Sequence, residues 1–137
     1  MSRPLRFLFC LTVSAILFVS TGCGSYGTEL NFSNGVQLYY ADPVTKDEAE
    51  KLGRWLEAVY HGAPPGELNR KKTFQLKRRG DLYQFRVVVD PALMDRIETE
   101  NRLRRVAAAV RHQVFEDRPL ELHMCDSRLQ TVKVVIP

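Results

Sequence analysis

The chain has 137 residues, 45% of them hydrophobic, a formal net charge of +4 and three cysteines. This length leaves room for one domain. A domain of this size buries roughly 60 to 70% of its unfolded surface, so a structural metal or a disulfide is not needed for folding.

The first predicted element is an export signal over residues 1–22. Arg3 and Arg6 give it a positive start, residues 7–19 form an apolar run without a charge, and residues 20–22 are small. Thirteen residues of helix rise about 20 Å, which is less than the roughly 30 Å of a hydrocarbon core. The pattern therefore predicts a cleaved signal peptide rather than a membrane span.

Cys23 directly follows Ser20, Thr21 and Gly22 and completes a lipobox-like pattern. In these residues the chain resembles the bacterial lipoprotein precursor family, in which this cysteine receives a diacylglyceryl group. Ser20 departs from the aliphatic residue usual at its position. The resemblance implies two or three acyl chains on Cys23, and these hold firmly because each buried methylene contributes about 0.8 kcal/mol. Gly24 is not the Asp that retains many lipoproteins in the inner membrane, so in a Gram-negative host the resemblance implies the outer membrane, facing the periplasm.

Removal of residues 1–22 takes away two of the 20 basic side chains and none of the 16 acidic ones, so the mature net charge falls to +2. Cys10 leaves with the signal and Cys23 carries lipid, which leaves Cys125 without a disulfide partner. Residues 23–34 are polar and rich in Gly and Ser, and we expect them to form the lipidated N-terminus and a tether.

The α+β domain is expected over residues 35–137. Alternation predicts a strand at 36–41, and Thr45 with Glu48 forms a capping box that begins a helix ending near Gly62. A hairpin follows at 72–90, and then a helix after Asp90, with a break near residues 98–101. Two further strands are predicted on either side of Asp126 and Ser127.

The predicted order is β-α-β-β-α-β-β. Its first six elements match a ferredoxin-like split βαβ arrangement. We therefore expect an antiparallel sheet of about five strands with two helices on one face.

One sheet face is predicted to be polar, and its residues are Tyr39, Gln75, Lys77, Gln84, Arg86, His123, Cys125 and Lys133. A ligand site on it would use Tyr39, Gln84, Arg86, His123 and Lys133. In element order and location the chain resembles peptidoglycan-binding SPOR domains, which use this face. A simply solvated face predicts the same alternation.

Six cations lie at 70–72 and 77–79. Nucleic acid is not expected as a partner, because an exported, anchored protein rarely meets it. Anionic head groups or an acidic partner protein suit the location better. The alternative is that these cations only keep a hairpin edge soluble and unpaired.

His123 and Cys125 are two residues apart on one strand, a spacing that suits two metal ligands or a thiol nucleophile. No second Cys or His pair accompanies them, so we expect no metal, no cofactor and no enzyme. As a whole the chain resembles small exported α+β lipoproteins. The sequence predicts a membrane-anchored, non-enzymatic binding or scaffolding module of the cell envelope. A SPOR-like domain that binds peptidoglycan is the first alternative, and a thiol or metal protein using Cys125 and His123 is the second.

Overall fold

Six strands form one sheet in which each strand lies beside the next strand of the sequence. The computed structural model describes residues 26–68 and 70–137. In chain order the strands are β1 (Thr28–Asn31), β2 (Val36–Tyr40), β3 (Lys72–Arg79), β4 (Leu82–Val88), β5 (Leu120–Cys125) and β6 (Thr131–Val135).

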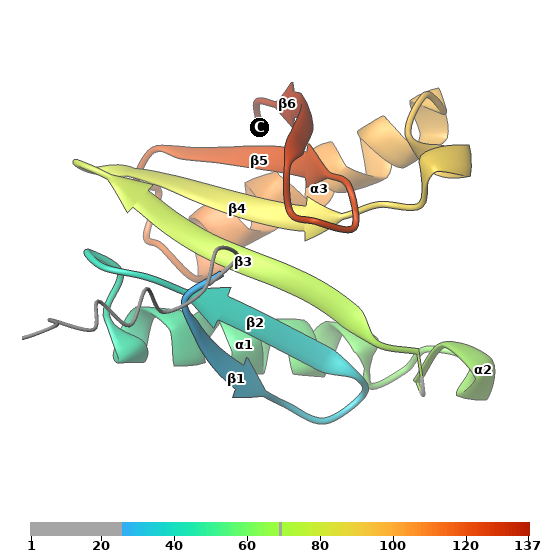
Figure 1. Cartoon of the computed structure of the whole chain (residues 1–137), viewed down its shortest axis with the longest axis horizontal. Coiled ribbons are helices and arrows are strands. Elements are labelled where there is room, and N and C mark those ends of the chain that lie inside the picture. Colours follow the sequence, from blue (N-terminus) through green and yellow to red (C-terminus); the bar gives the residue numbers. More distant parts are fainter. Residues whose placement is uncertain (1–25, 69) are drawn as a thin grey trace, which may run out of the picture.

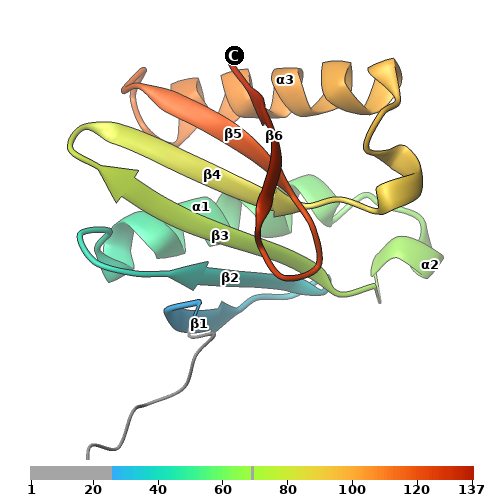
Figure 2. The same cartoon turned by 45° about the horizontal axis from the view of Figure 1, so that its top comes forward.

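Two long helices, α1 (Lys46–Tyr60) and α3 (Ile97–Gln113), cover the same face of the sheet (Figures 1 and 2). α1 connects β2 to β3, and α3 connects β4 to β5; each pair of strands is parallel and adjacent. The other three neighbouring pairs are antiparallel. A short helix α2 (Pro65–Leu68) precedes β3, and a 3₁₀ helix η1 (Pro91–Leu93) precedes α3.

The predicted α+β class with two helices on one face is confirmed, but the finer prediction is wrong in two respects. The sheet is mixed and six-stranded instead of antiparallel and five-stranded. In a split βαβ arrangement a further strand lies between the two strands joined by a helix. Here β2 pairs directly with β3 and β4 with β5, so the strand order is not ferredoxin-like.

Local sequence signals set the helix ends. Thr45 and Glu48 form the predicted capping box, with each side chain accepting from the other residue's backbone amide. Asp90 accepts from the amide of Ala92 and caps η1. The chain then breaks before Ile97, earlier than the predicted residues 98–101, so Glu98 and Glu100 lie in the first turn of α3, where the helix dipole favours acids.

Part of the segment predicted as a tether is folded. Thr28–Asn31 forms β1 and pairs antiparallel with β2. Phe32 packs against the core, and its ring lies against Gly53 of α1, where a Cβ atom would come within 2.1 Å of it. The domain therefore begins before residue 35.

The hydrophobic core lies between the sheet and the two helices. The strands contribute aromatic side chains, including Phe74 and Phe85, which stack with ring centroids 5.7 Å apart. Leu52 and Leu56 of α1 and Val110 of α3 pack onto them, each at most 2% exposed. Within residues 26–68 and 70–137, no helix has the length and apolar character needed to cross a bilayer.

Candidate functional site

Four residues of the predicted polar face form a continuous row across four strands. The register pairs Tyr39 with Gln75, Gln75 with Arg86, and Arg86 with His123. Gln84 lies in the adjacent row, between Lys77 and Glu121. Because strand side chains alternate with a period of two, these residues share the face that the helices leave uncovered.

The protein's own chain covers much of this face. At one side the carbonyl of Tyr26 accepts from Gln75 Nε2 at 2.8 Å, and the Tyr26 ring meets Tyr39 edge-on at 5.5 Å. At the other side Arg86 Nη2 donates to the carbonyl of Leu129 at 2.6 Å, in the turn between β5 and β6. Gln75 and His123 are consequently buried, so the row is less open than a solvated sheet face.

Lys133 does not belong to this face, and its predicted place there is wrong. It lies opposite Met124, whose side chain points into the core beneath the helices. Its ammonium group forms an ion pair with Glu100 of α3. The register shifts between Met124 and Cys125, and this irregularity changes which β6 side chains face the helices.

His123 and Cys125 do not form a reactive pair. The imidazole is held by Thr131 Oγ1 at 2.9 Å and by Glu121 Oε2 at 3.0 Å. The thiol is fully buried and donates to the backbone carbonyl of His123. Burial raises the pKa of Cys125, which keeps it a neutral thiol and a poor nucleophile. In the part of the chain that the structure describes, no group of three His, Cys, Asp or Glu residues could hold a metal.

The six cations predicted as one cluster separate in the structure. Lys77 and Arg79 are exposed near the β3–β4 turn. Lys72 lies 4.6 Å from the centroid of the Tyr60 ring and donates to the carbonyl of Asn34. Arg78 points to the helix side, where it is part of a polar network.

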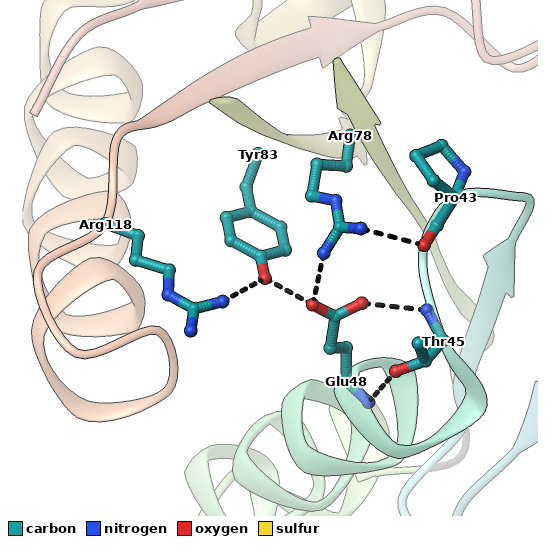
Figure 3. A network of polar contacts seen from close by, with 6 residues as sticks. All are labelled: Pro43, Thr45, Glu48, Arg78, Tyr83 and Arg118. Atoms are coloured by element: carbon teal, nitrogen blue, oxygen red, sulfur yellow. Dashed lines mark hydrogen bonds and ion pairs between the residues drawn. The ribbon is translucent and has the colours of Figure 1, made fainter. Parts of the chain in front are cut away.

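This polar network is centred on Glu48 (Figure 3). One carboxylate oxygen of Glu48 accepts from Arg78 Nη1 at 2.7 Å and from the hydroxyl of Tyr83, while the other accepts from the amide of Thr45 at 2.8 Å. Arg78 also donates to the carbonyl of Pro43, and Arg118 donates to the Tyr83 hydroxyl at 3.1 Å. The network joins the start of α1 to β3, β4 and the segment before β5.

The environment of Glu48 keeps it ionised. Burial of the carboxylate acts to raise its pKa, but the hydrogen bonds from Tyr83 and Thr45 and the charge of Arg78 outweigh this and lower the pKa. Every interaction is internal to the domain, so the network serves the fold. From the sequence Glu48 is expected only to cap the helix, because its partners Arg78 and Tyr83 lie 30 or more residues away in the chain.

A basic groove of about 460 Å³ lies at the opposite end of β3. It lies where β3 begins and β4 ends, next to the end of α1 and the start of α3, and Phe74, Val87 and Leu103 give it an apolar floor. We call this the basic groove, after its cations Arg70, Lys71, Lys72 and Arg102. Asp90 is an acidic residue in the lining, and Arg70, Lys71 and Arg102 form no ion pair with any carboxylate whose side chain the structure describes.

The groove has the features of a binding site for an acidic ligand with an apolar part. Cations at the rim attract an anion, and apolar side chains below them can take up hydrocarbon or aromatic groups. The cations at 70–72 stand together in the sequence, whereas Arg102 joins them only in the folded protein, from a distant helix.

Comparison with known proteins identifies one family. A family model, AF_1994_N, described as a family N-terminal domain, matches residues 30–135, which include strands β2 to β6 completely and the last two residues of β1. No curated protein and no solved structure shows a significant match to the chain.

Proposed function

The chain belongs to the AF_1994_N family, and we propose that this member is a bacterial lipoprotein, held at the cell envelope by acyl chains on Cys23. In this proposal the domain is a non-enzymatic binding or scaffolding module. The lipobox-like residues Ser20 to Cys23 lie outside the described residues and remain the basis for the anchor.

One observation carries the proposal best: the folded domain begins immediately after the predicted cleavage point. Tyr26 is already bound to the sheet through Gln75 and Tyr39, three residues after Cys23. A signal peptidase site needs accessible chain, and cleavage before Cys23 would leave every strand and helix of the domain intact. The predicted end of the leader and the start of the fold thus agree.

A binding role is supported by the basic groove, since it combines several cations with apolar lining residues. A catalytic role has less support, because the thiol of Cys125 is buried and its pKa is raised. The peptidoglycan-binding alternative relied on a ferredoxin-like strand order and on an open sheet face. Neither feature supports it now, since the strand order differs and Tyr26 and Leu129 cover part of that face.

The test is metabolic labelling of the full chain in bacteria with an alkyne analogue of palmitate. We expect the wild-type protein to incorporate the label, Cys23→Ser to lose it and Cys125→Ser to keep it. Each substitution replaces one cysteine sulfur by oxygen, so Cys125→Ser is the matched control. Labelling that survives Cys23→Ser would contradict the proposed anchor.

A further inference from the structure

The distance between the anchor and the folded domain restricts how the protein can lie on a membrane. Tyr26 is fixed on the sheet by its carbonyl and by its ring. From Cys23 to Tyr26 there are three peptide bonds, which span at most about 10 Å when extended. A domain attached through so short a segment cannot turn freely above the bilayer.

The part of the domain that must stay close to the bilayer is defined by what surrounds Tyr26. Tyr39 is its neighbour on β2, and Gln75 holds it on β3. Lys77 lies two residues further along β3 on the same face, about 7 Å away. We call Tyr26, Tyr39 and Lys77 the anchor corner. The two helices lie on the other face of the sheet (Figure 2).

We propose that the bilayer lies against the anchor corner, so that the sheet face opposite the helices points to the membrane and the helix-covered face points to the aqueous compartment. This inference rests on the proposed lipidation of Cys23. Two tyrosines suit the location, since their rings and hydroxyl groups favour the interface between hydrocarbon and water.

The orientation depends on tether length rather than on charge. Lys77 and Arg79 are exposed near the corner, but so are Glu29 and Asp81. Hydrogen bonds from Gln37 and Asn31 lower the pKa of Glu29, so it is ionised and offsets a cation. With charges nearly balanced, anionic lipids are not needed to hold the corner at the surface.

The orientation also assigns a kind of partner to the basic groove. The groove lies at the far end of β3 from Lys77 and takes Thr99, Arg102 and Leu103 from α3, the helix on the face away from Tyr26. Arg102 therefore faces the aqueous compartment, while Lys71 lies near enough to Glu29 to lower the pKa of that carboxylate and so stays at the edge of the other face. An acidic protein segment at the envelope is the partner whose chemistry fits this placement.

The experiment compares two labelled positions in the lipidated protein. A fluorophore is attached to Lys77→Cys at the anchor corner or to Arg105→Cys on the exposed side of α3; each change removes one exposed cation. Cys125 is fully buried and stays unlabelled in the folded protein. The proteins are placed in phosphatidylcholine vesicles that contain a lipid with a nitroxide on its head group, which quenches nearby fluorophores.

Because the segment of about 10 Å keeps the corner at the surface, we expect quenching to be about threefold or more stronger at position 77 than at position 105. A second variant carries about ten Gly and Ser residues between Gly24 and Ser25, with a flexible span of about 17 Å. In that variant the difference between the two positions should disappear.

Equal quenching at both positions with the native segment, or stronger quenching at position 105, would overturn the orientation. The mass of the same samples reports whether Cys23 carries acyl chains. If Cys23 is acylated and quenching is equal, the proposed function stands and the orientation alone is wrong. If Cys23 is unmodified, the proposed function and the orientation are both overturned.

Discussion

The cations at the two ends of β3 differ in whether they form ion pairs inside the domain. At one end Arg78 meets Glu48 inside the domain, and Tyr83 and Arg118 complete a network of internal partners. At the other end Arg70, Lys71 and Arg102 line a groove and form no ion pair with any carboxylate whose side chain the structure describes. Both groups include residues of one cation-rich stretch, so the number of cations in a sequence does not reveal which of them are available to a partner.

The difference follows from which face of the strand a cation occupies. Arg78 continues the inward row of Phe74 and Leu76, where an unpaired charge would be costly, and Glu48 neutralises it. Arg70 and Lys71 precede the strand and are exposed, so water can solvate them without a protein partner. The first arrangement stabilises the fold, and the second leaves charge for binding.

The largest expected effect is at the end of β3 where Arg78 contacts Glu48. Glu48→Ala removes the acceptor for Arg78, Tyr83 and the Thr45 amide, and we expect the free energy of unfolding to fall by about 2 to 4 kcal/mol. Glu50→Ala is the matched control on the same helix: its ion pair with Lys46 is 3.6 Å long, and the two side chains are 33% and 65% exposed, so a loss of about 0.5 kcal/mol or less is expected. Urea denaturation measures both. Equal losses would show that the network does not stabilise the domain.

The second largest effect is expected in acid, where protonation of Glu48 should lower the free energy of unfolding. The pKa of Glu48 is lowered in the folded state, so its contribution is present above the unfolded value of about 4.3 and is lost as pH falls through the folded value. We expect wild-type stability to fall more between pH 5 and pH 3 than that of Glu48→Gln, which has no proton to gain at this position. Urea denaturation at several pH values measures the difference. Parallel pH profiles would mean that other carboxylates cause the acid sensitivity.

The smallest effect is expected when a carboxylate is added to the basic groove. Thr99 lines the basic groove in the first turn of α3. Thr99→Glu should raise the free energy of unfolding by about 0.5 kcal/mol, because the new carboxylate faces cations and a helix N-terminus. The gain should shrink in 1 M salt. Asn101→Glu, on the same helix outside the groove, should change stability less; an equal gain would mean that the groove cations play no part.

Local signals in the sequence predicted most of the secondary structure, while the strand order needed the structure. The Thr45 and Glu48 capping box and the alternation over 72–90 depend on residues close in the chain, and both predictions are confirmed. Parallel pairing of β2 with β3 depends on how α1 packs, which alternation does not report. The four residues of β1 are mostly polar and exposed, so no hydrophobic pattern separated them from a tether.

The candidate site shows the same limit. A period of two correctly placed Tyr39, Arg86 and His123 on one face. It failed for Lys133 because the β6 residues do not alternate regularly between buried and exposed, and because the register shifts between Met124 and Cys125 of the partner strand. One usable signal for the Glu48 network was present: Arg78 falls in the inward row of β3, and a cation in such a row predicts an internal carboxylate.

The claim that Cys23 attaches this domain to a bilayer is tested most directly by the intact mass of the protein purified from its native membranes. The account predicts a chain that begins at Cys23 and carries the added mass of a diacylglyceryl group, with or without a third acyl chain. A chain with an unmodified Cys23, or one that retains residues 1–22, would contradict it.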